Sequence, residues 1–286
     1  MKQFFIGIMV MLMCMACEKP LMTGNQEEEE TEGNLKIKVF EIEKTPFGSL
    51  TRATEEASAV CKHLNYAIYS TSGERLKQVN QTTGTSEFGI ASFQLDEGKY
   101  RVVVVGHSSN GNPTMTDPTC IKFTNAQTFT DTFLYSDEVT VGEDQVELNI
   151  SMNRIVSMCR FVLTDDIPKE IKKMRFYYTG GSGAFDATTS LGCVNSKQDV
   201  KIDITNGDQK QFDLYTFLHD EEGVIHLAVS ALDASGNELY AREFDVPMEQ
   251  NHITWLSGAF FSGVSTTTVT GVTVNTTWEG EQHLTF

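Results

Sequence analysis

Alternation of apolar and polar residues is the feature that most constrains the fold of this chain. From residue 34 onward almost every stretch has a period of two, as in LKIKVFEIE at 35–43 and VELNISM at 146–152. The segment KYRVVVVG at 99–106 is instead a continuous β-branched run, which is typical of a buried strand. Turn sequences such as TSGE at 71–74 separate these stretches at short intervals. The pattern predicts an all-β fold built from sandwiches.

One segment departs from this pattern. The sequence DDIPKEIKKM at 165–174 places Ile167, Ile171 and Met174 on one helical face, behind an aspartate cap and an early proline. We expect a helix of one or two turns here, with the two aspartates at its start acting as caps.

Two parts of the chain have the same predicted order of strands and turns. The segments 64–79 and 226–244 each predict a strand, a Ser-Gly turn and a charged strand. Each is followed by a second predicted hairpin, at 92–106 and 243–258. The shared order suggests two related domains, although hairpins of this kind also resemble one another in unrelated β proteins.

The N-terminal residues have the features of a secretory signal. Lys2 is followed by an apolar stretch from Phe4 to Met13, which is shorter than the roughly 20 residues of a membrane-spanning helix. The small residue Ala16 stands directly before Cys17, so Cys17 is the better candidate for the first mature residue.

The sequence MAC at 15–17 resembles the lipobox of bacterial lipoproteins, in which the cysteine receives acyl chains. This resemblance implies lipidation of Cys17, although Cys14 stands three positions earlier, where leucine is usual. Several acyl chains would hold the protein at a membrane without spanning it. The alternative is an ordinary signal peptide whose cysteine pairs elsewhere.

Charge excludes one class of partner. The chain has 22 Lys and Arg against 39 Asp and Glu, a formal net charge of -17, and no basic stripe of the kind that nucleic acid requires. The acidic run NQEEEETEG at 25–33 has no apolar residue and cannot pack against a core. It predicts a solvated, extended tether.

These observations divide the chain into four parts. The expected parts are a lipoprotein signal peptide at 1–16, an acidic tether at 17–34, an N-terminal β-sandwich at 35–148 and a C-terminal β-sandwich at 149–286.

Four cysteines lie beyond Cys17, in a chain whose export would permit disulfides. They allow three pairings, and sequence does not choose among them. The simplest pairing joins Cys61 to Cys120 and Cys159 to Cys193, within each half. Cys159 alternates with apolar residues, so a buried free thiol is equally compatible with the sequence.

No motif for chemistry is evident. TGGSGAF at 179–185 lacks the spacing of a nucleophile elbow, and the six histidines have no paired spacing for a metal. We therefore expect no catalytic residues, cofactor or metal, although distant carboxylates could still converge. Trp255 and Trp278 lie in alternating stretches and are more typical of a core than of a sugar-binding platform.

Motifs in order along the mature chain resemble those of the fimbrillin-associated anchor lipoproteins of Bacteroidetes, the FimB-type anchors of type V fimbriae. The motifs that carry the resemblance are MAC at 15–17, LNYAIYSTSGE, LDEGKYRVVVVG, NRIVSMCRFVLTD at 153–165, and FDLYTFLHDEEG leading to NHITWLSGAFF. The resemblance implies two tandem transthyretin-like β-sandwich domains and a non-enzymatic protein. It also implies that the protein anchors a fimbrial polymer in the outer membrane, at the cell surface.

The resemblance further implies fimbrillin stalk subunits as partners, bound by β-strand addition. A polar alternating segment at 263–278 is a candidate interface strand, although a plain edge strand of the second domain is about as compatible with it. Its alternating residues are Val264, Thr266, Thr268, Thr270, Val272 and Val274.

Stalk subunits of such fimbriae are cut after an arginine, and Arg52 in SLTRATEE at 49–56 is the matching candidate. For an anchor we expect no cleavage, because a cut would separate the lipid from the domains unless the strand at 35–43 stays bonded. A glycan-binding surface lipoprotein is the alternative function, and it would need an exposed aromatic platform.

Overall fold

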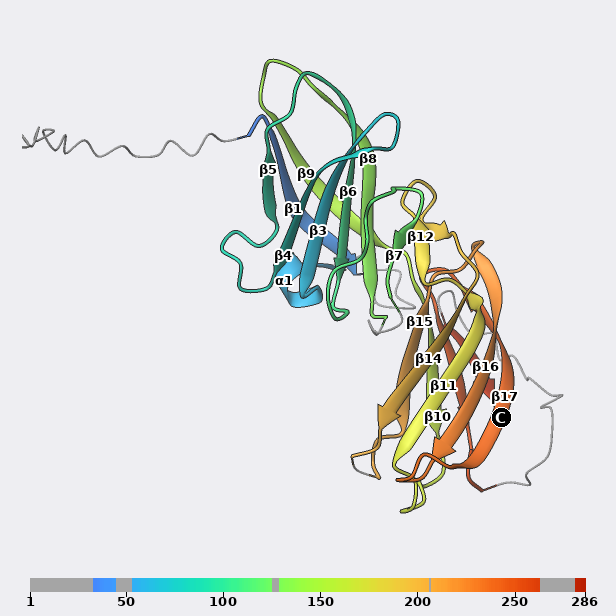
Figure 1. Ribbon diagram of the computed structural model, residues 1–286. Helices are drawn as coiled ribbons and strands as arrows, with labels where there is room; N and C mark the ends of the chain where they lie inside the picture. Colours follow the sequence, from blue (N-terminus) through green and yellow to red (C-terminus); the bar gives the residue numbers. More distant parts are fainter. Residues whose placement is uncertain (1–32, 45–52, 125–128, 206, 263–280) are drawn as a thin grey trace, which may run out of the picture. The chain divides into compact units, whose positions relative to one another are not determined.

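The computed structural model describes residues 33–44, 53–124, 129–205, 207–262 and 281–286 (Figure 1). The chain separates into two units, Met1–Thr31 and Glu32–Phe286, and every described residue lies in the second. The described residues form an all-β structure with several sheets and one short helix, α1, Ala57–Val60. The prediction of an all-β protein is confirmed.

The N-terminal part forms one eight-stranded sheet in the order β2-β1-β9-β8-β6-β3-β4, with β5 also paired to β1. Its strands are β1 (Leu35–Lys44), β2 (Ala53–Glu55), β3 (His63–Ser70), β4 (Arg75–Thr82), β5 (Ile90–Phe93), β6 (Gly98–His107), β8 (Thr132–Val141) and β9 (Val146–Arg154). β8 and β9 share only two paired positions, Phe133 with Arg154 and Leu134 with Asn153. The sheet can therefore fold over at this corner, and buried residues of β1, β5 and β9 join those of β3, β6 and β8 in one core.

The continuous apolar run of β6 is explained by burial on both faces. Val102 and Val104 belong to the core just described, whereas Val103 and Val105 belong to a second cluster on the opposite face. All four side chains are fully buried. A strand covered on both sides does not need alternation, because neither face meets water.

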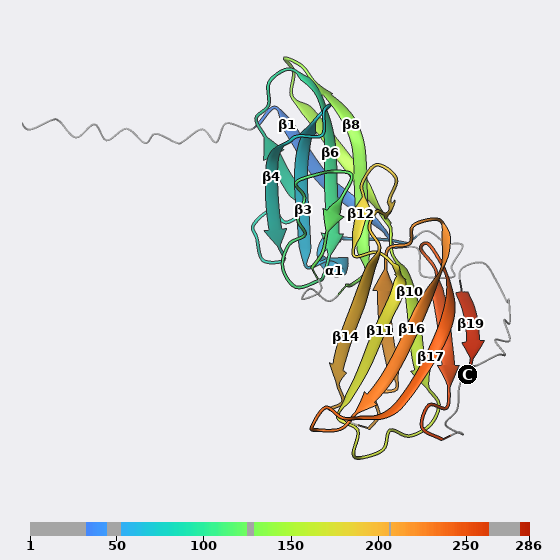
Figure 2. The same ribbon diagram turned by 45° about the vertical axis from the view of Figure 1, so that its right-hand side comes forward.

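The C-terminal part forms two four-stranded sheets, β15-β10-β18-β19 and β14-β11-β16-β17 (Figure 2). Their strands are β10 (Ser157–Leu163), β11 (Lys173–Gly181), β14 (Ser196–Asp203), β15 (Gln211–Thr216), β16 (Glu222–Leu232), β17 (Glu238–Glu249), β18 (Ile253–Gly258) and β19 (Glu281–Thr285). Phe161 of β10 contacts Phe176 of β11 and Phe244 of β17, with ring centroids 5.5 and 6.0 Å apart. One apolar core therefore lies between the two sheets.

A small third sheet combines strands from both parts of the chain. β7 (Ile121–Lys122), from the connection between β6 and β8, pairs with β12 (Ala184–Asp186), which also pairs with β13 (Leu191–Gly192). The second cluster on the outer face of β6 includes Ile121, Phe185 and Phe217. We call this combination of the β7-β12-β13 sheet and its cluster the seam.

A buried ion pair also lies at the seam. The guanidinium of Arg154, at the end of β9, donates to both carboxylate oxygens of Asp131 at 2.6 and 2.8 Å and to Oδ1 of Asn251 at 3.2 Å. Only 2% of the Arg154 side chain is exposed. The predicted domain limit at residue 148 lies inside β9, which pairs with β1 and β8, so we propose that the boundary falls between β9 and β10.

The prediction of a helix at 165–174 is wrong. Residues 164–172 contain a bend and a turn but no regular secondary structure, and β11 begins at Lys173. Asp165 does not cap a helix, because its carboxylate accepts hydrogen bonds from the distant backbone N–H groups of residues 260–262. Ile171 is fully buried in the core between the C-terminal sheets. Tertiary contacts therefore override a weak local helical pattern.

The prediction of two hairpins in each half is only partly correct. β3–β4 and β16–β17 are antiparallel hairpins, as predicted. The second hairpin predicted in each half is wrong, because β5 pairs with β1 and β18 pairs with β10 and β19. The connection after β5 leads to β6 elsewhere in the same eight-stranded sheet, and the connection after β17 leads to β18 in the facing sheet. In the first, the side-chain amide of Asn34 holds both backbone groups of Leu95, at 2.8 and 3.0 Å.

The cysteine pairing within each half is also wrong. Cys61 and Cys159 are buried free thiols, whereas Sγ of Cys193 lies 3.1 Å from Sγ of Cys120. The alternative of a buried Cys159 thiol is confirmed. Pairing by proximity in sequence failed because the seam brings the two halves together at this point.

Candidate functional site

The predicted site residues lie outside the described part of the chain. These are Cys17, Arg52 and the interface strand residues Val264, Thr266, Thr268, Thr270, Val272 and Val274. The structure does describe the segments that flank the interface strand, Ser262 on one side and β19 on the other.

β19 lies at the end of its sheet. It runs parallel to β18 in a register from Ile253 opposite Glu281 to Ser257 opposite Thr285, and in the described part of the chain its strand partner is β18. The N–H of Phe286 donates to the carbonyl of Ser257 at 2.9 Å. Because successive N–H groups of a strand point to opposite sides, the N–H of Thr285 points away from β18.

Apolar contacts hold β19 in place. Leu284 is 1% exposed and belongs to the core between the C-terminal sheets. The ring of Phe286 stacks on Phe161 with centroids 5.2 Å apart and packs against Phe244 at 4.8 Å. A Cβ added at Gly258 would collide with the carbonyl oxygen and ring of Phe286, so only glycine permits this close approach.

Hydrogen bonds to the carboxylate of Asp165 fix the chain that follows β18. Oδ1 of Asp165 accepts a hydrogen bond from the N–H of Phe260 at 3.0 Å, and Oδ2 accepts those of Phe261 and Ser262 at 2.6 Å each. Burial opposes ionisation of this carboxyl, but the hydrogen bonds together outweigh it and lower the pKa of Asp165. The clamp therefore holds the last described residues before the predicted interface strand.

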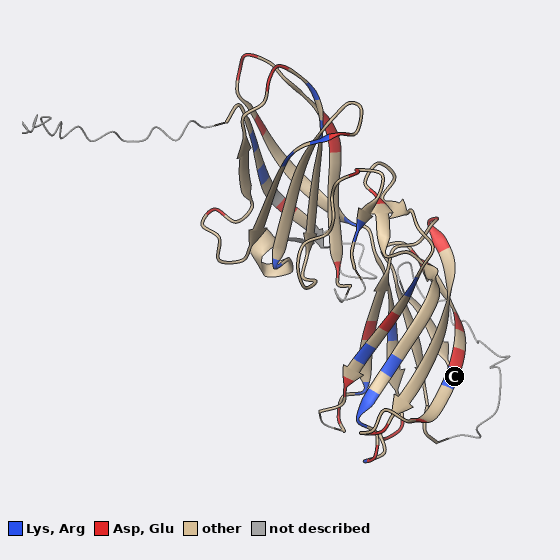
Figure 3. Ribbon diagram, viewed as in Figure 1, with Lys and Arg blue, Asp and Glu red and all other residues tan. Residues whose placement is uncertain are grey.

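The edges of the sheet β14-β11-β16-β17 are strongly charged. β14 exposes Lys197, Asp199, Lys201 and Asp203 in alternation, and charges of both signs lie along the strands of this sheet (Figure 3). β17 carries several charged residues together with Pro247, which lacks a backbone N–H. Lysine and proline on edge strands discourage pairing with another chain.

The edge strands of the facing sheet have fewer features that discourage pairing with another chain. β15 and β19 have the sequences QFDLYT and EQHLT, with neither lysine nor proline. On β15, both oxygens of the Asp213 carboxylate accept hydrogen bonds from Arg160 of β10, at 2.7 and 2.8 Å. The chain after β15 is also occupied, because Phe217 forms a backbone bridge with Ser182. The outer edge of β19 is therefore the best candidate in the described chain for pairing with another strand.

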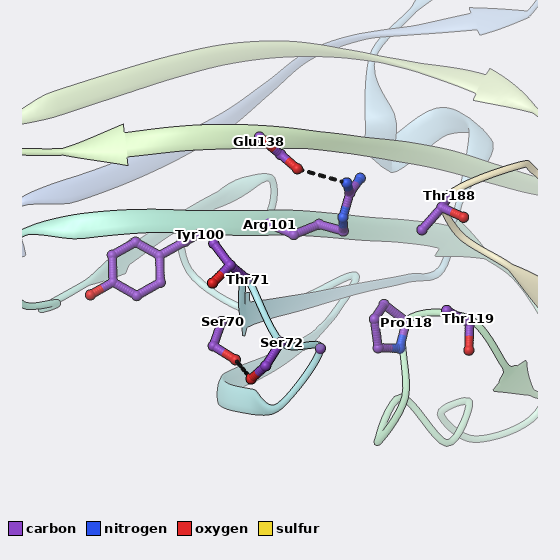
Figure 4. A pocket seen from close by; sticks show the side chains of 10 residues that line it. Ser70, Thr71, Ser72, Tyr100, Arg101, Pro118, Thr119, Glu138 and Thr188 are labelled. Atoms are coloured by element: carbon purple, nitrogen blue, oxygen red, sulfur yellow. Dashed lines mark hydrogen bonds and ion pairs between the residues drawn. The ribbon is translucent and has the colours of Figure 1, made fainter.

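A polar hollow lies between the β3–β4 turn and the seam (Figure 4). Arg101 reaches Glu138 at 3.1 Å and Ser136 at 3.3 Å, and the hydroxyl of Tyr100 donates to the carbonyl of Asp96 at 2.8 Å. These groups are already satisfied by the protein itself. The hollow thus lacks convergent polar groups of the kind that would orient a sugar or another small ligand.

Other signs of chemistry are also missing from the described residues. They contain no cluster of three or more side chains suited to a metal, and no helix long and apolar enough to cross a membrane. Among them no aromatic side chain is exposed. Trp255 is half-buried between Arg160, 4.8 Å from its ring centroid, and the ring of His283, at 5.4 Å.

Sequence reasoning missed the Asp165 clamp, the Arg154 ion pair and the Cys120–Cys193 contact. Each joins residues at least 23 positions apart, and no local pattern indicates such contacts. An adjacent aspartate pair is a weak signal, because Asp165 is a clamp whereas Asp166 is an exposed partner of Lys210.

Comparison with known proteins supplies the family. The model of the family described as fimbrillin-A associated anchor proteins Mfa1 and Mfa2 matches residues 27–279. No curated protein sequence matches the chain significantly.

Solved structures give weaker likenesses. The fimbrial anchor protein Mfa2 from Porphyromonas gingivalis is 12% identical, with a TM-score of 0.41 over 73% of this chain and 80% of that one. A fimbrial assembly protein from Parabacteroides distasonis is 13% identical, with a TM-score of 0.39 over 79% of this chain and 89% of that one.

 At these identities and TM-scores the likenesses add no weight to the family match, which rests on sequence.

Proposed function

The chain belongs to the family of fimbrillin-A associated anchor proteins Mfa1 and Mfa2, and from this premise we propose that it fixes the base of a fimbrial polymer to the outer membrane. The family consists of non-enzymatic structural proteins of the cell surface. The match over residues 27–279 is the observation that carries the proposal.

We propose two tandem transthyretin-like β-sandwich domains as the scaffold. The separate apolar cores of the N-terminal sheet and of the C-terminal sheet pair support this division. The seam would transmit force between the domains, because main-chain pairing and a shared apolar cluster join them there, together with the hydrogen bond from Arg154 to Asn251.

We propose that acyl chains on Cys17 hold the protein in the outer membrane, with residues 17–34 as a spacer. The lipobox-like MAC sequence and the acidic run at 25–33 support this role. Each buried methylene of an acyl chain contributes about 0.8 kcal/mol, so several chains would give a firm anchor.

Arg52 is expected to remain uncleaved in an anchor. β1 precedes Arg52 and pairs with β5 along one edge and with β9 along the other. A cut after Arg52 would therefore leave the lipid-bearing segment held only by hydrogen bonds and packing, which is a weaker connection than a continuous chain.

For the partner, we propose that a fimbrial subunit adds a strand beside β19. The absence of lysine and proline from β19 and the outward N–H of Thr285 support this edge. The predicted interface strand at 263–278 precedes β19 directly in sequence and would contribute to the same surface.

Site-specific photocrosslinking in cells that assemble fimbriae tests this proposal. A benzophenone amino acid at Thr285 should crosslink to a fimbrial subunit, because an added strand would lie within reach. The matched control is Leu239, an exposed residue of the charged edge strand β17, where we expect no such product. Crosslinking at Leu239 but not at Thr285 would contradict the proposed edge.

A further inference from the structure

We propose that Cys120 and Cys193 form a disulfide bond that covalently staples the two parts of the chain across the seam. Their sulfur atoms lie 3.1 Å apart although the residues are 73 positions apart in sequence. Cys120 comes from the connection between β6 and β8, and Cys193 follows β13.

The backbone on both sides of the pair is fixed before any bond forms. β7 begins directly after Cys120, and its Ile121 pairs with Phe185 of β12. The N–H of Cys193 donates to the carbonyl of Ala184 at 3.2 Å, which ties it to the same strand. The N–H of Ala187 donates to the carbonyl of Pro118 at 2.8 Å and closes the arrangement from the other end.

A local turn holds the Cys120 side. The carboxylate Oδ1 of Asp117 accepts hydrogen bonds from the N–H and the hydroxyl of Thr119, both at 2.8 Å. The N–H of Cys120 donates to the carbonyl of Asp117 at 3.1 Å. The sulfur atoms need to approach by only about 1 Å to reach the bonded separation of about 2.0 Å, which a small rotation of the side chains supplies.

The other two cysteines of the described chain are unsuited to this reaction. Cys61 and Cys159 are 1% and 0% exposed and belong to different apolar cores. Burial raises the pKa of Cys159 to about 12, and it also raises the pKa of Cys61. Both therefore stay protonated and unreactive at neutral pH.

The bond would form by thiol–disulfide exchange with an oxidised dithiol protein of the export pathway, since the family acts at the cell surface. One cysteine of the pair loses its proton, and its sulfur attacks the donor disulfide, which gives a mixed disulfide and a donor thiolate. The other cysteine then loses its proton and attacks the protein sulfur of the mixed disulfide, which forms the Cys120–Cys193 bond and releases the second donor sulfur as a thiolate. The two cysteines give up two electrons and two protons, and the donor is reduced to its dithiol.

Peptide mapping of the full-length exported protein tests the proposal directly. Cells are quenched with N-ethylmaleimide, and the protein is denatured with more reagent and digested with trypsin without reduction. Cleavage after Arg101, Lys122, Arg175 and Lys197 places the two cysteines in separate peptides, 102–122 and 176–197. We expect these peptides to be linked, whereas the peptides of Cys61 and Cys159 carry the maleimide and serve as internal controls.

Maleimide on both Cys120 and Cys193, or a link from either to another cysteine, would overturn the proposal. A stability measurement tests the staple separately. Dithiothreitol should lower the thermal midpoint of the wild-type protein by about 5 to 15 °C and leave that of the C120S/C193S variant unchanged. An equal response of the two proteins would contradict a stabilising bond at this position.

Discussion

The edge strands of the two C-terminal sheets differ in their content of charged residues and proline. β14 and β17 carry alternating charges and Pro247, whereas β15 and β19 of the facing sheet carry neither lysine nor proline. Both sheets contribute to the same apolar core, so the difference is not required for folding. It indicates that one sheet is protected against pairing with other chains and that the other is available for it.

The comparison depends on β19 being an integral strand of the fold. Leu284→Ala should lower the free energy of unfolding by about 2 to 5 kcal/mol, because it removes a buried side chain from the core. Urea denaturation measures this loss. The exposed neighbour provides the control, since Thr285→Ala should change stability by less than about 0.5 kcal/mol. Equal, small effects of the two variants would show that β19 is not part of the cooperative unit.

The packing of Phe286 against Gly258 provides a second test of whether β19 is an integral strand. Gly258→Ala should cost about 1 to 3 kcal/mol, because the added Cβ meets the backbone and ring of Phe286. Gly142→Ala is the matched control, since nothing lies within 4 Å of a Cβ at that position.

A double-mutant cycle then checks the cause of that effect. The Gly258→Ala and Phe286→Ala changes should be less costly together than the sum of the two single changes, because the second removes the ring that the first displaces. Additive costs would mean that the Gly258 effect comes from the collision with the backbone carbonyl of Phe286 and not from its ring.

A lysine introduced on the edge strand of each sheet tests directly whether the two sheets differ in their ability to bind another strand. Thr285→Lys should weaken binding of a purified fimbrial subunit about tenfold, or about 1.4 kcal/mol, because lysine on an edge opposes strand addition. Leu239→Lys, with the same change of charge on β17, should alter the affinity less than twofold. Surface plasmon resonance would measure both, and a larger effect of Leu239→Lys would reverse the assignment of the edges.

The Asp165 clamp should give a smaller effect that depends on pH. Asp165→Asn should cost about 1 kcal/mol at pH 7, because the amide accepts the three backbone hydrogen bonds less well than the carboxylate. The pKa of Asp165 is lowered from its ordinary 3.8, so its contribution is fully present above that value. It is lost as the pH falls through the lower pKa of the folded state.

Thermal unfolding of the wild type and of Asp165→Asn between pH 7 and pH 3 measures this dependence. Asp166→Asn is the control, since Asp166 is almost fully exposed and pairs only with Lys210 at the surface. A difference between wild type and Asp165→Asn that persists unchanged at the acidic end would show that hydrogen bonds to the ionised carboxylate are not responsible.

Sequence predicted the strands well and their partners less well. Alternation located β1 and β9, and a continuous apolar run located β6, because the local order of residues shows whether one face or both faces of a strand are buried. It misassigned the partners of β5 and β18, because sheet membership depends on contacts such as that of Asn34 with Leu95, 61 positions away. The helical pattern at 165–174 failed for the same reason.

The candidate site was predictable only in outline. Polar alternation predicted an interface strand at 263–278, which lies outside the described residues and directly before β19. The protection of the other edges became evident only once strands were assigned to sheets. The cysteine pair was not predictable, since the seam that joins Cys120 to Cys193 involves strands of only two or three residues. Such short strands have no periodicity to detect.

Replacement of the predicted lipid-bearing cysteine tests the central claim most directly. In cells that assemble fimbriae, the N-terminal peptide of the wild-type protein is analysed by mass spectrometry, and the fimbrial polymer is quantified in the membrane fraction and in the medium. We expect an acylated Cys17 and a membrane-bound polymer in the wild type, and release of the polymer into the medium with Cys17→Ser. A Cys17→Ser protein that is made at normal levels and still holds the polymer at the membrane would contradict the account.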